Sequence, residues 1–388
     1  MSVNTMTFED ASAILNNIRQ QVTGQASIAP VNTAEFVSVG TTLLQSGYDP
    51  VLNAITQMVT KTLFSIRPYS RKFGGIKVDS EMWGSIVRKL AVADKPFEEN
   101  KEFDLVDGQS IDHYKVNKPD VLELKFYGAE DFAKSYTIFK AQLNNAFNGA
   151  AEFSNFMTMV VQNVSDMIEQ NFESIARMII ANYVGGKKVA NNGVIHLLTE
   201  YNAETGLSLT GTTVFAPANF GDFMKWVYAR IATLTSLMTE RSTEFQINVS
   251  GKPITRHTPF EYQKVYLYAK LLNDMNACVL ADTFNYDFIE YADVEAVNYW
   301  QSIETPMAID VTPNYLDTDG SIKTGAEQNI TNLVGVIFDR EALGYTVMNE
   351  WSATTPLNAS GGYWNTFFHF LMKWWVDYSE KGIILLLD

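Results

Sequence analysis

One stretch of helical periodicity, residues 151–186, dominates the pattern of apolar and polar positions along the chain. Apolar side chains recur there every three or four residues, which is the spacing of one face of an α-helix. These positions are Phe153, Phe156, Met157, Val160, Val164, Ile168, Phe172, Ile175, Ile179 and Tyr183. No proline interrupts the run. The pattern predicts one helix from an N-cap at Ser154 to Val184, about 46 Å long at 1.5 Å per residue, with Gly185 and Gly186 ending it.

The first 66 residues carry three shorter amphipathic patterns joined by polar links. Thr7, Asn32 and Pro50 stand where capping and first-turn residues are expected. The predicted helices cover residues 8–20, 34–47 and 50–64. Segments this short indicate an arm that lies on another part of the protein, because none of them supplies a core of its own.

Residues 67–126 change from the helical period to strand-like patterns at 83–92 and 120–127. A polar, turn-rich stretch separates these two patterns. We therefore expect a long two-stranded finger, and we use that name for residues 67–126. Residues 67–93 hold six basic and two acidic side chains, whereas residues 94–112 hold seven acidic and two basic ones.

The rest of the chain mixes helical and strand patterns, which indicates an α+β fold. Helices are expected at 136–147, 217–241 and 271–280, and strands at 245–249, 265–269, 333–338, 361–378 and 382–388. We expect the last two strands to form a terminal hairpin with its turn at residues 379–382. Residues 200–345 hold 19 acidic and 9 basic side chains, so most of the excess negative charge lies there.

The composition excludes several classes of protein. The net charge is −15, which argues against a surface that grips nucleic acid through clustered lysines and arginines. Cys278 is the single cysteine, so neither an intrachain disulfide nor a cysteine-rich metal site is expected. We expect neither a signal peptide nor a membrane span.

No pattern in the sequence indicates catalysis, a metal or a cofactor. The four histidines lack metal-ligand spacing, and His369 between two phenylalanines is expected to be a packed or surface residue of a strand. Cys278 lies in an apolar segment and fits a buried position better than a nucleophile. Residues 185–188 and 317–321 only partly match a phosphate loop and a calcium loop, and we interpret them as a helix end and a turn.

The order of these parts resembles the major capsid proteins of tailed bacteriophages, which have the Hong Kong 97 fold. The stretches at 336–345 and 362–369 carry the resemblance. The second of them, together with residues 34–40 and 71–75, looks closest to the small short-tailed phages of Bacillus. The resemblance implies five parts: an N-terminal arm (1–66), an extended loop (67–126), a peripheral domain with a spine helix (127–190), an axial domain (191–345) and a return to the peripheral domain (346–388).

The same resemblance implies a structural role without catalysis. Subunits would form hexamers and pentamers of an icosahedral shell, which assembles in the bacterial host cytoplasm, becomes part of the virion and encloses double-stranded DNA without sequence-specific binding. Scaffolding, portal and decoration proteins are the other partners that it suggests, and no membrane is involved. Three alternatives stay open: an encapsulin-like compartment, another phage component such as a portal or tail protein, and an enzyme with an unrecognised site.

The uneven charge of the finger suggests how subunits would meet. We expect the acidic tip of one finger to dock against basic residues at the base of the next. The candidate interface residues are Arg71, Lys72, Arg88, Glu98, Glu99 and Glu102. A charged loop that is simply solvated is the alternative interpretation.

Overall fold

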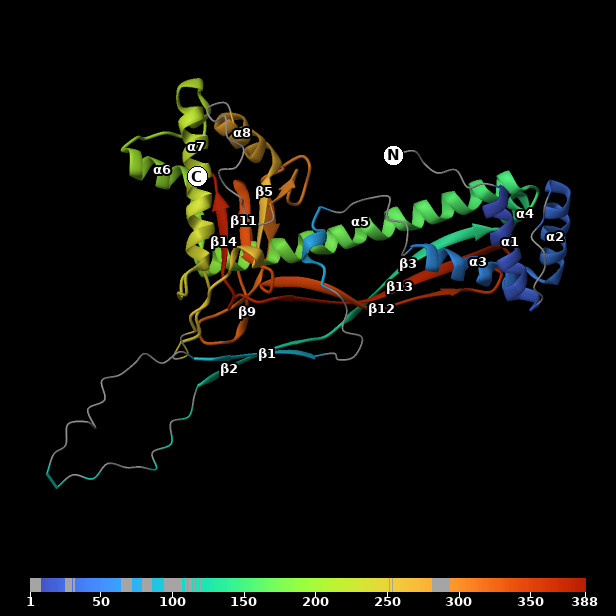
Figure 1. Ribbon diagram of the computed structural model, residues 1–388, viewed down its shortest axis with the longest axis horizontal. Coiled ribbons are helices and arrows are strands. Elements are labelled where there is room, and N and C mark those ends of the chain that lie inside the picture. Colours follow the sequence, from blue (N-terminus) through green and yellow to red (C-terminus); the bar gives the residue numbers. More distant parts are fainter. Residues whose placement is uncertain are drawn as a thin grey trace.

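A computed structural model describes residues 8–24, 30, 32–63, 72–78, 86–93, 121–250, 252, 254–280 and 294–388, with isolated positions between 107 and 120. A long helix, α5 (Ala150–Ala190), runs along the molecule beside an elongated sheet (Figure 1). Short helices gather at one end of α5, and a second sheet with its own helices lies at the other end (Figure 1).

The helix α5 confirms the main prediction from the sequence but extends beyond it at both ends. It contains 41 residues, begins after Gly149 rather than Ser154, and ends at Asn191, which adopts the left-handed conformation. Gly185 and Gly186 lie inside the helix, so the expected helix end there is wrong. A Cβ on Gly185 would lie 2.6 Å from Val311, and one on Gly186 would lie 2.2 Å from the hydroxyl of Tyr378. These two glycines therefore allow close packing.

Three helices of the N-terminal region pack near the start of α5, as the amphipathic patterns predict. They are α1 (Phe8–Thr23), α2 (Thr33–Ser46) and α3 (Tyr48–Leu63). Asn32 caps α2 by accepting a hydrogen bond from the backbone N–H of Glu35. The third helix begins two residues before Pro50. Buried Phe36 of α2 meets Phe153 of α5 with ring centroids 5.7 Å apart, so this arm shares the main core.

The elongated sheet contains three antiparallel strands in the order β12–β13–β3. These strands are β12 (Leu343–Thr354), β13 (Tyr363–Val376) and β3 (Glu130–Phe139). Alternate residues of β13 are buried, which is the pattern of a strand with one covered face. Phe370 meets Phe172 of α5 edge-on at 5.4 Å, so the long helix covers that face. The helix expected at 136–147 is partly wrong, because β3 continues to Phe139 and only α4 (Lys140–Ala146) is helical.

The second sheet has five strands in the order β4–β14–β11–β5–β6. The central strand β11 (Leu333–Asp339) is buried along its whole length, as its continuous apolar run predicts. It pairs antiparallel with β14 (Gly382–Leu386) and β5 (Gln263–Tyr268), while β4 (Val194–His196) and β6 (Val294–Val297) add parallel edges. The helices beside this sheet are α6 (Leu197–Thr205), α7 (Pro217–Thr239) and α8 (Ala269–Leu280).

Two strand predictions in this half of the molecule need correction. Residues 245–249 form no strand, and Phe245 has a φ of 64°, which breaks an extended chain. The expected terminal hairpin is also wrong, since β13 and β14 belong to different sheets. The turn that joins them is buried, and Asp377 accepts hydrogen bonds from the backbone N–H and hydroxyl of Ser379. This turn redirects the chain from one sheet to the other.

In the part that the structure describes, the finger contains the strands β1 (Ile86–Val92) and β2 (Val121–Tyr127), paired antiparallel without a register shift. The short helix η1 (Gly74–Ile76) precedes β1 within the finger, and the backbone N–H of Val78 donates a hydrogen bond to the carbonyl of Tyr345 in β12. In two further small antiparallel sheets, β7 (Ile309–Val311) pairs with β10 (Gln328–Ile330), and β8 (Asn314–Leu316) pairs with β9 (Ile322–Thr324).

Candidate assembly site at the root of the finger

The two faces of the finger have different surroundings. Neighbouring residues of a strand point to opposite faces, and residues opposite each other in an antiparallel pair share a face. Lys89, Leu122 and Phe126 therefore lie on the face toward the body, where Leu122 is buried. The other face shows Leu90 and Val92, which are 62% and 57% exposed. The finger is thus anchored on one side and open on the other.

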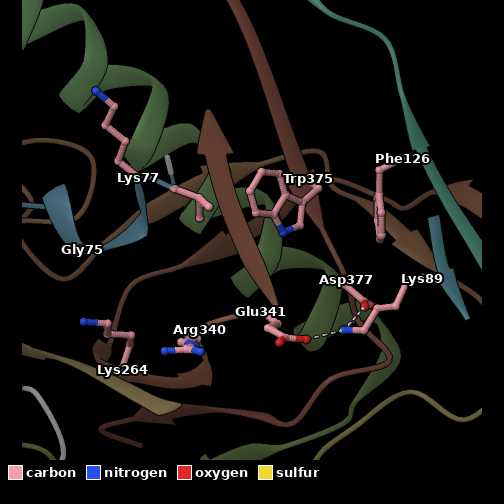
Figure 2. Close-up of a pocket in the computed structure, with 10 residues that line it drawn as sticks. Gly75, Lys77, Lys89, Phe126, Lys264, Arg340, Glu341, Trp375 and Asp377 are labelled. Atoms are coloured by element: carbon pink, nitrogen blue, oxygen red, sulfur yellow. Dashed lines mark ion pairs between the residues drawn. The ribbon is translucent and has the colours of Figure 1, made fainter. Parts of the chain in front are cut away.

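The anchor is an ionic cluster around Lys89 of β1. Its ammonium lies 3.1 Å from a carboxylate oxygen of Asp377 and 3.3 Å from one of Glu341, and it also pairs with Glu380. Figure 2 shows Lys89 pointing to Asp377 and Glu341. Arg256 approaches Glu380 from another side at 3.0 Å. Two cations thus meet three carboxylates where the finger joins the body.

Burial and charge together set the protonation of this cluster. Burial lowers the pKa of Lys89, but Asp377 and Glu380 more than offset this effect, so the pKa lies above its ordinary value. Burial raises the pKa of Glu380, an effect that Lys89 and Arg256 oppose. Removing one partner from a buried pair of this kind leaves an uncompensated charge, which costs about 3–5 kcal/mol. The cluster therefore makes departure of the finger from the body costly.

The turn that carries Asp377 and Glu380 is itself held firmly. The buried Lys381 donates hydrogen bonds to the backbone carbonyl of Glu240 at 2.6 Å and to the hydroxyl of Ser242 at 2.9 Å. Tyr378 stacks on Tyr183 of α5, with ring centroids 5.6 Å apart. The finger is therefore connected through this turn to the long helix.

A cavity of about 590 Å³ opens beside the cluster. Val78, Phe126 and Trp375 supply its apolar lining, and Lys77, Lys264 and Arg340 supply further positive charge. Figure 2 shows these side chains around the cavity together with Lys89. A Cβ on Gly75 would lie 2.8 Å from a carboxylate oxygen of Glu295, so the backbone of Gly75 packs closely against the Glu295 side chain.

The structure places only part of the interface expected from the sequence. Arg71, Glu98, Glu99 and Glu102 lie outside the described residues. Lys72 is exposed in the turn before η1. Arg88 lies in β1 and pairs with Lys125 of β2. The described residues therefore do not test the expected interface, which stays a prediction.

Sequence reasoning missed Lys89 as an anchor, together with Asp377, Glu341 and Glu380. A signal for this cluster was present in the sequence. Asp377, Glu380 and Lys381 interrupt an otherwise apolar stretch between Trp374 and the strand that starts at Gly382. Charged residues in such a place need partners when they are buried.

His369, Asp317 and Asp319, which the sequence analysis considered for a chemical role, contact neighbouring side chains of the fold. His369 stacks on Trp351 with ring centroids 3.8 Å apart, and its Nδ1 lies 2.9 Å from a carboxylate oxygen of Asp131. It is therefore a packed strand residue, as predicted. Asp317 and Asp319 both pair with Lys323, which supports a turn rather than a calcium loop. Within the described residues, no group of histidine, cysteine or acidic side chains is arranged to hold a metal ion.

The described helices include none that is long and apolar enough to cross a membrane. Two solved phage structures contain chains with a similar fold. A chain of the capsid of Staphylococcus phage Andhra is 12% identical, with a TM-score of 0.54, over 82% of this chain and 84% of that one. A chain from the structure of head fiber and inner core protein gp22 of native bacteriophage P68 is 11% identical, with a TM-score of 0.55, over 82% and 85% of the two chains.

The comparison with protein families covers almost the whole sequence. No curated protein matches the chain. The family model for the Phi29-like phage major capsid protein matches residues 12–377. The mixed helix-and-sheet fold, shared with chains of phage structures, agrees with this match. The chain therefore belongs to the Phi29-like phage major capsid protein family and is a structural protein of the virion.

Proposed function

We propose that this capsid protein has the Hong Kong 97 fold and forms hexamers and pentamers of an icosahedral shell around double-stranded DNA. The observation that carries the proposal is the open face of the finger. Leu90, Val92 and Val121 are between 43% and 62% exposed there, although they lie in a regular paired strand region. A contiguous apolar row on a thin projection is typical of a surface that another subunit covers.

The expected division of the chain supports this proposal. The arm (1–66), the finger (67–126), the peripheral domain with its spine helix (127–190 and 346–388) and the axial domain (191–345) would be the parts of the shell subunit. The long helix α5 lies beside one sheet and reaches the other, which supports its role as the spine (Figure 1). The small short-tailed phages of Bacillus are the relatives that we propose, on the sequence resemblance given above.

The acidic excess of the chain supports a container for nucleic acid. A wall with a net charge of −15 repels packaged DNA and does not hold it in place. Expression in a bacterial host followed by electron microscopy tests the proposal. We expect closed shells, and with the other phage components, particles that protect double-stranded DNA from nuclease. Open rings or tubes would contradict the shell, and closed particles that enclose an enzyme instead of nucleic acid would indicate an encapsulin-like compartment.

The contact expected between subunits has its own test. We propose that the acidic tip of one finger, with Glu98, Glu99 and Glu102, docks on a neighbouring subunit. Changing all three to lysine should leave the subunit folded by circular dichroism but impair shell closure. A single exposed ion pair is worth only about 0–1 kcal/mol, but the loss repeats at every contact of a shell. Normal closure of this triple variant at low ionic strength would support the solvated-loop interpretation instead.

A further inference from the structure

We propose that the cavity at the root of the finger is the receptor for the acidic tip segment, residues 94–112, of a second copy of this chain. The inference rests on the proposed shell and deepens it, because it names the surface on which the tip docks. The cavity differs from the basic residues suggested by the sequence. Besides Lys89, its positive groups are Lys77, Lys264 and Arg340, which come from three different parts of the chain.

The charge around the cavity separates into a neutralised interior and a positive rim. The carboxylates of Asp377 and Glu380 are 1% and 5% exposed and pair with Lys89 and Arg256. They therefore offer little repulsion to an incoming acidic segment. The rim carries Lys77, Lys264 and Arg340 against the carboxylate of Glu341 and that of Glu295 beside Lys264. The rim is therefore net positive, although the chain as a whole has a charge of −15.

Arg340 is the rim residue best placed to receive a carboxylate. It is exposed, and its guanidinium lies 3.7 Å from the ring centroid of Tyr262. Across the described parts of the chain, no carboxylate lies within ion-pair distance of it. Stacking on the ring holds the planar group in place while its N–H donors stay available for carboxylate oxygens.

The tip segment has the composition that such a cavity fits. Phe97 is followed by two glutamates, and Phe103 lies between Glu102 and Asp104. An aromatic side chain flanked by carboxylates matches apolar walls with a positive rim. Val78, Phe126 and Trp375 would cover the ring, and the rim would bind the acidic neighbours. Charge and apolar content thus agree on the same occupant.

Binding of a labelled peptide of residues 94–106 to the unassembled full-length subunit tests the receptor, with fluorescence anisotropy as the measurement. We expect Arg340→Glu to weaken binding about tenfold, because one attractive contact becomes repulsive. Lys270→Glu is the matched control and should not change binding. Its side chain is 67% exposed on α8, away from the finger (Figure 1). Equal binding by wild type and Arg340→Glu, or equal binding of a scrambled peptide, would overturn the proposal.

Carbodiimide crosslinking of assembled particles identifies the copy that supplies the tip. Particles are assembled from an equal mixture of subunits with natural and heavy nitrogen, and the crosslinks join tip carboxylates to Lys77 or Lys264. We expect crosslinked peptides of mixed isotope composition in the proportion set by random pairing. Crosslinks within one isotope only would place the tip on its own chain and overturn the second-copy assignment. The peptide measurement needs no shell, so failure to assemble and failure of the receptor give different results.

Discussion

The rings of Tyr183 and Tyr378 stack with an interplanar angle of 11°, and this stack joins the long helix to the turn that anchors the finger. The hydroxyl of Tyr378 lies 2.9 Å from the backbone carbonyl of Asn182 and 2.8 Å from that of Asn314. Asp377, the residue just before Tyr378 in this turn, is a partner of Lys89. Displacement of the finger root therefore acts on α5 through this turn.

The first prediction concerns the ionic anchor. Lys89→Met should lower the free energy of unfolding by about 3–5 kcal/mol, because Asp377 and Glu380 stay buried without their lysine. Urea unfolding of the subunit measures this loss. Lys125→Met is the matched control on β2, where the lysine is 54% exposed and pairs only loosely with Glu123 at 3.5 Å. Its effect should stay within about 1 kcal/mol.

Combining Lys89→Met with Glu380→Gln checks the mechanism of that loss. Without Lys89, Arg256 is the one cation of the cluster against three carboxylates, so removing the charge of Glu380 should recover part of the lost stability. If the two losses were simply additive, Lys89 would act through packing of its aliphatic chain and the electrostatic explanation would be wrong.

The second prediction compares two helical glycines, one closely packed against a neighbour and one with open space beside it. Gly185→Ala should destabilise the subunit, since the new Cβ would lie 2.6 Å from Val311. Gly221→Ala in α7 meets nothing within 4 Å and should stabilise by about 0.5–1 kcal/mol through helix propensity. Thermal unfolding of both variants compares them directly. A gain in stability from both changes would mean that Gly185 has no packing role.

Local pattern was sufficient to predict the long helix, because its apolar period repeats over many turns without help from distant residues. It was also sufficient for the α2 cap at Asn32 and for the buried strand β11. The helix ends were not predictable in the same way. Whether Gly185 and Gly186 end a helix or allow close packing depends on Val311 and Tyr378, which are distant in sequence.

The pairing of strands was harder to predict than their existence. Two strands separated by a short polar turn suggest a hairpin, and β13 and β14 fit that description. The turn between them is buried and carries Asp377 and Glu380 toward Lys89, which lies almost 300 positions earlier. No local pattern contains that contact, so the sequence could predict a finger but not the cluster that anchors it.

The third prediction tests the long helix as a continuous element. Ile168→Pro removes a backbone hydrogen bond in the middle of α5 and should cost about 3 kcal/mol or more. We expect circular dichroism to show lost helix and electron microscopy to show no shells. Asp166→Ala is the control, since it lies in the same part of α5 and leaves the backbone unchanged. Normal particles from Ile168→Pro would show that assembly does not need an unbroken helix.

The last prediction concerns Lys187, which lies fully buried near the end of α5. Its ammonium donates hydrogen bonds to the backbone carbonyl of Phe245 at 2.6 Å and to Asn192 at 3.1 Å. Burial lowers the pKa of Lys187 to about 7, although Asp377 opposes this effect. The folded protein therefore loses this proton near pH 7, whereas the unfolded chain keeps it until about pH 10.5.

Because the unfolded state binds the extra proton between these two values, the free energy of unfolding should rise with pH across that window. The contribution of Lys187 has a slope of at most about 1.4 kcal/mol per pH unit. Burial also lowers the pKa of Lys381, which adds a slope of the same sign, but Lys187→Met leaves that residue unchanged. Urea unfolding from pH 7 to 9.5 should therefore show a steeper rise for wild type than for Lys187→Met. The range stops below pH 10 because burial raises the pKa values of Tyr183 and Tyr378, whose ionisation in the unfolded chain reverses the trend. Parallel curves for the two proteins would mean that Lys187 stays charged inside the fold, with its two hydrogen bonds and Asp377 compensating for burial.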